Sequence, residues 1–172
     1  VSDRKELSAM VGKMQVESSS PFFNFYIGAD EKNSTMNIMQ FYQGGISMGE
    51  RDYYLMDDEN SAKLRAAYRN YVNTLFTLAG YSKEEAEKAA ETVISLETRI
   101  AEVSVDRNTL RDVHKNYNKM SVKDFVKKFD FIDWEIFFKE TGIKNSTELN
   151  ASQLTFFEGL TRLLKKTPLE DQ

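Results

Sequence analysis

The sequence predicts a mainly α fold: a helical domain with a small antiparallel β-hairpin near the N-terminus. Apolar residues recur at helical spacing over most of the chain, which is typical of amphipathic helices. Aromatic and branched residues alternate with polar ones only between residues 21 and 43, where two strands are expected. With 172 residues, of which 41% are apolar, the chain is long enough to bury one core.

The N-terminal part is predicted to form one helix followed by the hairpin. Apolar residues at helical spacing place the helix over about residues 3–16, and Glu17–Pro21 ends it. The two strand-like runs are residues 21–30 and 35–43, and they flank the turn-forming residues Asp30–Ser34. An antiparallel pair joined by a short loop is therefore expected.

Two long antiparallel helices are predicted next, because two apolar stripes are separated by a short connection. Gly80 is expected just beyond the end of the first helix, and Ser82 with Glu85 forms a capping box that begins the second. The first stripe is Leu64, Ala67, Tyr68, Tyr71, Val72, Leu75, Phe76 and Ala79. The second stripe is Ala86, Ala89, Ala90, Val93, Leu96, Ile100 and Val103.

Shorter elements are predicted in the last third of the chain. The polar segment Asp106–Met120 is expected to be a loop or a short irregular helix. Ser121 and Asp133 are expected to cap two short helices, and Asn150 to cap a final helix that Pro168 ends.

Ser47 is the first candidate site residue, because it lies in the G-x-S-x-G pattern of a serine-hydrolase nucleophile elbow. An elbow needs a helix directly after the serine and a parallel sheet around it, but residues 50–54 carry no helical stripe. The single histidine, His114, lies beside Lys115, and a neighbouring cation disfavours the imidazolium of a triad. We therefore interpret the pattern as a turn in which glycines such as Gly45 adopt positive φ.

The sequence offers no convincing metal ligands. One histidine and no cysteine leave too few ligands for a typical zinc site, so His114 is interpreted as a surface or hydrogen-bonded residue. The acidic run Asp57–Glu59 lacks the spacing of a calcium loop and is better explained as the negatively charged start of a helix.

Two further features are interpreted as structural. Arg51 and Asp52 are expected to tie the turn to the following helix through charge-assisted bonds. Adjacent aromatic pairs are expected to be core residues, with one ring of a pair available to meet another domain. These pairs are Phe22–Phe23, Phe41–Tyr42, Tyr53–Tyr54, Phe137–Phe138 and Phe156–Phe157.

The segment Gln43–Leu55, QGGISMGERDYYL, resembles the Q-G-G-L-x-L-P-x-R-D-Y-Y-L signature of the neprilysin-like zinc metalloendopeptidases. Other segments resemble the family in the same order, over nearly the whole chain. They are Asp30–Ser34, Leu96–Ala101, Arg111–Asp112 with Tyr117–Met120, Phe131–Trp134 and Leu164–Leu169. The main departure is Gly49, where the family often has proline, and it reduces the rigidity of the turn.

The resemblance implies that residues 1–172 are a single partial domain, a fragment of the N-terminal helical lid domain of a larger peptidase. In the family this domain closes over the catalytic domain and encloses a cavity that admits only short peptides. The parent would be a zinc endopeptidase that hydrolyses internal bonds of oligopeptides, with zinc polarising the carbonyl and activating water.

The family's catalytic motifs, H-E-x-x-H and E-x-x-D, are not expected in this part of the parent, and H-E-x-x-H does not occur in the chain. We therefore predict no catalytic, cofactor-binding or metal-binding residue here. The fragment should bind no zinc and be inactive alone.

The implied partners are oligopeptide substrates and the catalytic domain of the same chain, and the implied location is periplasmic, extracellular or membrane-anchored. The net charge of −4 argues against nucleic acid, and no apolar run is long enough to predict membrane contact by this segment. The alternative is a stand-alone, non-enzymatic helical protein-binding module. H-E-x-x-H in the gene downstream of Gln172 would favour the peptidase, and an early stop codon the module.

Overall fold

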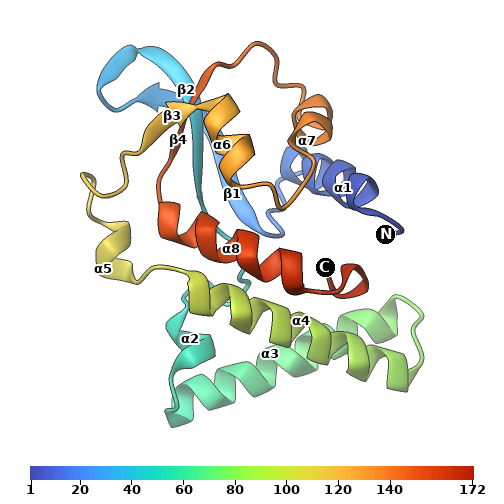
Figure 1. Cartoon of the computed structure of the whole chain (residues 1–172). Helices are drawn as coiled ribbons and strands as arrows, with labels where there is room; N and C mark the ends of the chain where they lie inside the picture. The colour runs from blue at the N-terminus through green and yellow to red at the C-terminus, as the bar shows by residue number, and fades with distance from the viewer.

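The computed structural model describes residues 1–172 and is mainly helical, as predicted (Figure 1). The helices are α1 (Arg4–Val16), α2 (Asp52–Leu55), α3 (Glu59–Leu78), α4 (Lys83–Val103), α5 (Arg107–Leu110), α6 (Val122–Lys128), α7 (Trp134–Glu140) and α8 (Leu154–Lys166), followed by the 3₁₀ turn η1 (Leu169–Asp171). The strands are β1 (Phe23–Asp30), β2 (Asn33–Gln43), β3 (Lys119–Ser121) and β4 (Glu148–Ala151).

The four strands form one mixed sheet in the order β1-β2-β4-β3. The predicted hairpin is confirmed, since β1 and β2 pair antiparallel with Phe23 opposite Gln43. The expectation of only two strands was incomplete, because β4 pairs parallel with β2 and antiparallel with β3. β3 and β4 are too short to show alternation in the sequence. The prediction that Asn150 caps the last helix was wrong: Asn150 lies in β4, and α8 begins at Leu154.

The core is an aromatic cluster between the sheet and helices α1, α6, α7 and α8. The Phe23 ring lies 5.6 Å from Phe41 and 5.5 Å from Trp134, both measured between ring centroids. The indole N–H of Trp134 donates to the carbonyl of Phe129 at 2.6 Å, so the buried ring leaves no unpaired donor. Each predicted aromatic pair places at least one ring in the buried interior, which confirms the core interpretation.

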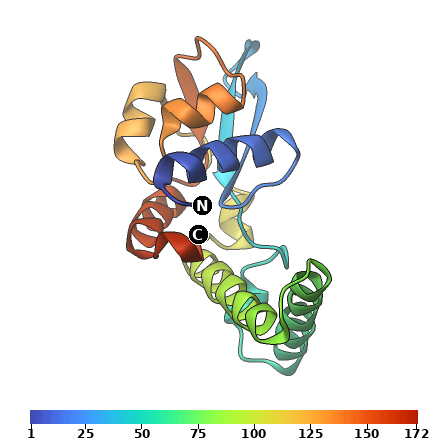
Figure 2. The ribbon, with the colours of Figure 1, turned by 90° about the vertical axis from the view of Figure 1, so that its right-hand side faces the viewer.

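Helices α3 and α4 form an antiparallel hairpin that extends away from the sheet, at the bottom of Figure 2. Asp58 caps α3 by accepting from two backbone amides, and Ser82 with Glu85 forms the predicted capping box of α4. Between them Gly80 adopts φ +95, and the Tyr81 amide donates to the Phe76 carbonyl. This bond, with the one from Gly80 to Thr77, is the Schellman arrangement that ends a helix.

The apolar stripe predicted on α3 is only partly buried. Val72 is 5% exposed, whereas Tyr71 is 59% and Leu75 46% exposed. The stripe is wider than the surface that α4 and the short helix α2 cover, so part of it stays in contact with solvent. None of the helices has both the length and the apolar composition that crossing a membrane requires.

The remaining helix starts agree with the sequence. Ser121 caps α6 and Asp133 caps α7, each through a side-chain oxygen that accepts a backbone amide of the first turn. The segment 106–120 contains only the four-residue helix α5 and turns, as expected, except that its last two residues begin β3.

Candidate functional site

The turn that contains Ser47 is fastened to the α3–α4 hairpin by one carboxylate, that of Glu97 on α4. The Ser47 hydroxyl donates to Glu97 Oε1 at 2.6 Å, and the Ser47 amide donates to Oε2 at 3.2 Å. The Tyr68 hydroxyl donates to Oε1 at 2.9 Å, and the Tyr54 hydroxyl donates to Oε2. Tyr54 also accepts from the Met48 amide at 3.0 Å. One acidic side chain therefore joins the turn to α2, α3 and α4.

The tyrosines of this cluster stay protonated at neutral pH. Burial raises the pKa of the Tyr68 hydroxyl to about 12, and the negative charge of Glu97 adds to the rise. Burial, together with the hydrogen bond to Glu97, also raises the pKa of Tyr54 well above its ordinary value. Both phenols are therefore fixed donors to the carboxylate, and the cluster is suited to holding the turn in place.

Ser47 lacks the surroundings of a hydrolase nucleophile. The next helix, α2, begins only at Asp52 and has four residues, and the sheet is mixed and mostly antiparallel. In such an elbow the amide of the residue after the serine, here Met48, stabilises the oxyanion, and the Met48 amide is bound to the Tyr54 hydroxyl instead. No histidine bonds the Ser47 hydroxyl, whose partner is the carboxylate. The G-x-S-x-G pattern is a turn, in which Gly45 has φ +78 and Gly49 has φ +84.

Arg51 also holds the turn, but not in the predicted way. Its Nε donates to the carbonyl of Ala101 at 3.2 Å, near the C-terminal end of α4. It therefore links the turn to α4, not to the helix that directly follows.

The other sequence candidates lie apart from one another. The ring of His114 is exposed, and only its backbone amide is bound, to Asp112 Oδ1 at 3.1 Å. Hydrogen bonds from the Ser61 side chain and backbone lower the pKa of Asp58, as expected for a helix cap. No group of three or more His, Cys, Asp or Glu side chains that could hold a metal ion occurs in the chain.

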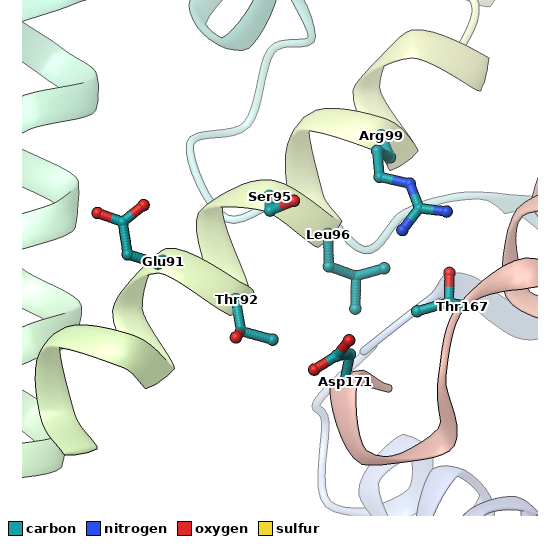
Figure 3. A pocket seen from close by; sticks show the side chains of 7 residues that line it. All are labelled: Glu91, Thr92, Ser95, Leu96, Arg99, Thr167 and Asp171. Atoms are coloured by element: carbon teal, nitrogen blue, oxygen red, sulfur yellow. The ribbon is translucent and has the colours of Figure 1, made fainter.

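Two hollows flank η1 where it crosses α4. The first, a polar groove of about 240 Å³, is shown in Figure 3. Arg99 extends from α4 toward Thr167, and Asp171 points from η1 toward the same helix. The residues that line it are Glu91, Thr92, Ser95, Leu96, Arg99, Thr167 and Asp171.

The second hollow, here called the apolar groove, has a volume of about 580 Å³ and runs along α4 from Tyr81 to Ile100, where Pro21, Phe22 and Gly45 also line it. Its walls include Phe76, Tyr81 and Val93, and it shares Leu96 and Asp171 with the polar groove. Neither hollow is lined by a histidine. Sequence reasoning missed both, because their walls combine α4 with the C-terminal residues and, in the apolar groove, with Pro21, Phe22 and Gly45, and only the tertiary fold brings these segments together.

Two buried polar clusters were also missed. The Asn150 side chain donates to Gln40 Oε1 at 2.9 Å and accepts from the Asn118 amide at 2.6 Å, which links β2, β4 and the segment before β3. Asp30, only 1% exposed, accepts from Lys119 and Tyr117.

Hydrogen bonds from the Lys32 amide and from the Lys119 and Tyr117 side chains lower the pKa of Asp30 to about 2. Both Asp30 and the segment Tyr117–Met120 belong to the family-like motifs, so the sequence did single them out. It did not show that the two segments are in contact, because no residue near either segment indicates this.

Comparisons with known proteins agree with this fold. The family model described as Peptidase family M13, for the N-terminal region, matches residues 1–172. Endothelin-converting enzyme 1 of Homo sapiens is 30% identical over 87% of this chain, and endothelin-converting enzyme-like 1 of Mus musculus is 29% identical over 96%. The chain spans 20% and 22% of the length of these two relatives, respectively.

Solved structures give the same result. The zinc metalloprotease Zmp1 of Mycobacterium tuberculosis, in its open state, superposes with a TM-score of 0.92 at 27% identity, covering 99% of this chain and 27% of that one. PepO from Lactobacillus rhamnosis shares the fold, with a TM-score of 0.74 at 14% identity over 98% of this chain and 26% of that one.

Proposed function

This chain belongs to peptidase family M13, and from that membership we propose that it is part of a zinc metalloendopeptidase that hydrolyses internal peptide bonds of oligopeptides. The observation that carries the proposal is the match of the family model over residues 1–172. The similarity to a solved zinc metalloprotease over 99% of this chain supports it.

Within that enzyme, residues 1–172 form a single partial domain that helps to enclose the substrate cavity and is itself catalytically silent. Three features support the proposed catalytic silence: the chain lacks H-E-x-x-H, its one histidine is exposed, and Ser47 is bound within a structural cluster. The zinc ligands then lie elsewhere in the parent protein. The residues of this chain contribute shape and rigidity to the lid.

The partners in this proposal are oligopeptide substrates and the catalytic domain of the same chain, with no nucleic acid and no membrane contact by this segment. The net charge of −4 and the absence of a membrane-spanning helix are compatible with those partners. An exported location, periplasmic, extracellular or membrane-anchored, follows from the family resemblance.

The test compares the full-length protein with residues 1–172 expressed alone. We expect the full-length protein to contain stoichiometric zinc and to cleave an internally quenched peptide, and a chelator to abolish the cleavage. We expect residues 1–172 to bind no zinc and to release no fluorescence. Turnover or stoichiometric zinc in residues 1–172 would refute the silent role, and a full-length protein without chelator-sensitive cleavage would refute the enzyme.

A further inference from the structure

We propose that the free edge of β1 binds an extended oligopeptide, which joins the sheet as a further strand. In its ligand this inference rests on the proposed function, whose substrates are oligopeptides. The binding site itself is the backbone of β1 with the side chains on either side of it, which lie outside the Glu97 cluster and outside the two hollows beside η1.

The first observation is that β1 is an edge strand. The sheet order is β1-β2-β4-β3, so β1 has a partner strand on one side only. In Figure 2 the outer part of the β1–β2 hairpin rises beyond α1, at the top right. An edge strand presents a row of unpaired N–H and C=O groups, and these groups can pair with another extended chain.

The hydrogen bonds of β2 show which groups of β1 point outward. The Phe41 carbonyl accepts from the Ser152 amide at 2.8 Å, so it points toward β4 and away from β1. Phe25 lies opposite Phe41, and bonded and non-bonded pairs alternate along an antiparallel ladder. Phe25 and Phe41 are therefore a non-bonded pair, and the N–H and C=O of Phe25 point away from β2. The same holds two residues further on for Ile27, which lies opposite Met39.

Side chains limit this free edge at both ends. The Gln15 side chain donates to the carbonyl of Phe23 at 2.5 Å, and the Gln40 side chain donates to the carbonyl of Ala29 at 3.2 Å. Between these two carbonyls, no side chain and no segment outside the sheet bonds an outward backbone group. The free stretch is therefore short, and its length suits a short peptide.

The free edge also lacks the features that keep edge strands from pairing. Natural edge strands are protected by charged side chains, by proline or by bulges. The segment Phe23–Ala29, FNFYIGA, has no charged residue and no proline. The register shift of β1 comes only at the end of this segment, between Ala29 and Asp30. The edge is therefore open to a further strand.

Exposed apolar side chains lie on both faces beside the free edge. On one face Tyr26 is 54% exposed and contacts the Tyr42 ring edge to face, with 5.9 Å between the ring centroids. On the other face Ile27 is 60% exposed and lines a hollow of about 410 Å³ whose wall also includes Ile143. Alternate side chains of an added strand point to opposite faces, so one contacts Tyr26 and the next contacts Ile27. Main-chain bonds supply affinity, and these contacts favour apolar or aromatic side chains in the peptide.

The occupant is a short peptide and not a second copy of the chain. A stable interface between two proteins takes about 20–30 residues from each side. Only Phe25 and Ile27 have free outward groups between the carbonyls bound by Gln15 and Gln40, so pairing of two β1 edges buries too little surface for a stable dimer. An extended peptide needs only such a short stretch of backbone.

Hydrogen exchange at single amides of the full-length protein tests the inference, because neighbouring residues of β1 should differ. The probe is a blocked peptide of alternating valine and threonine, about six residues long, which is a usual strand length. A saturating hydroxamate without peptide bonds, which binds zinc, keeps the probe out of the catalytic centre.

Without the probe, the amides of Phe25 and Ile27 should exchange fast, and those of Tyr26 and Gly28, which pair with β2, should exchange slowly. Probe at about ten times its dissociation constant should slow Phe25 and Ile27 about tenfold and leave Tyr26 and Gly28 unchanged. A probe with methylated backbone nitrogens, which cannot donate, should slow neither outward amide.

Ile27→Pro and Ile27→Ala are a matched pair of variants. Both remove the isoleucine side chain, but proline also removes the outward N–H and places its ring at the free edge. Because this N–H lies outside the ladder, both variants should fold, and slow exchange at Tyr26 verifies it. The probe should still slow the Phe25 amide in Ile27→Ala, but not in Ile27→Pro.

Three results would overturn the inference: slow exchange at Phe25 and Ile27 before any probe is added, no slowing by the probe, or equal slowing in the two Ile27 variants. Protection that follows the protein concentration would identify a second copy as the occupant and would overturn it too. The measurement does not use peptide cleavage. An inactive protein with the expected exchange would therefore refute the proposed enzyme and leave the binding site standing, and an active enzyme without that exchange would refute only the binding site.

Discussion

Gly45 and Gly49 bracket Ser47 and provide a matched pair of substitutions. Both have positive φ, at +78 and +84, so replacing either with alanine forces an L-residue into the left-handed region at about 1–2 kcal/mol. They differ in their surroundings. A Cβ on Gly45 would lie 2.8 Å from the Pro21 carbonyl oxygen and 2.9 Å from the Phe22 Cα, whereas a Cβ on Gly49 meets nothing within 4 Å.

The clash at Gly45 involves backbone atoms, which cannot rotate away as a side chain can. Phe22 is 1% exposed and belongs to the core, so its backbone can move only by disturbing packed rings. Overpacking of this kind adds about 1–3 kcal/mol. We therefore expect Gly45→Ala to lower the free energy of unfolding by about 2–5 kcal/mol, and Gly49→Ala by about 1–2 kcal/mol.

Urea unfolding followed by tryptophan fluorescence measures the difference, since the single tryptophan, Trp134, lies in the same core. With a slope of about 2 kcal/mol per molar urea, the Gly45 variant should unfold about 0.5–1.5 M urea earlier than the Gly49 variant. Equal midpoints for the two variants would refute the argument that the close approach to Pro21 and Phe22 fixes glycine at position 45.

Three further predictions concern the polar clusters. Glu97→Ala should lower the free energy of unfolding in urea by about 2–3 kcal/mol, because two tyrosine hydroxyls, the Ser47 hydroxyl and the Ser47 amide lose their acceptor. Glu97→Gln should cost less, and equal losses for the two variants would contradict this reasoning. Asp30 has a pKa of about 2 in the fold, below the unfolded value of about 3.9, so its stabilising effect is present above pH 4 and is lost as pH falls through 2. Asp30→Asn should therefore flatten the decline of the urea midpoint between pH 4 and 2, and an unchanged slope would exclude this role. Asn150→Leu should lower the free energy of unfolding by about 2–4 kcal/mol, because the Asn118 amide and Gln40 Oε1 lose their partners. A loss below about 1 kcal/mol in thermal unfolding would show that water replaces the Asn150 side chain.

The elements with strong local signals could be predicted. Helical periodicity predicted α1, α3 and α4. The capping residues Ser82, Ser121 and Asp133 predicted where their helices begin to within one residue. These signals depend on contacts between residues a few positions apart, so they are visible in a linear sequence. The hairpin was visible for the same reason, because its strands are long and neighbours in the chain.

The misplaced elements depend on distant contacts. Asn150 looks like a helix cap in isolation, but the parallel pairing of β4 with β2 places it opposite Gln40, 110 residues away. The apolar stripe of α3 predicts a packed face, yet α4 and the short helix α2 cover only part of it and Tyr71 stays 59% exposed. An amphipathic pattern identifies the apolar face of a helix, but it does not identify the element that packs against that face.

Read as a linear string, the amino acids predict a mainly helical protein, family-like motifs from Asp30 to Leu169, and a glycine-rich turn around Ser47. The folded molecule adds that Glu97 holds that turn, that Asp30 contacts Lys119, and that η1 ends at an apolar groove. The two sets differ because helix propensity, capping and turn chemistry act between near neighbours in the chain. Burial and hydrogen bonding between segments exist only once the fold has brought them together.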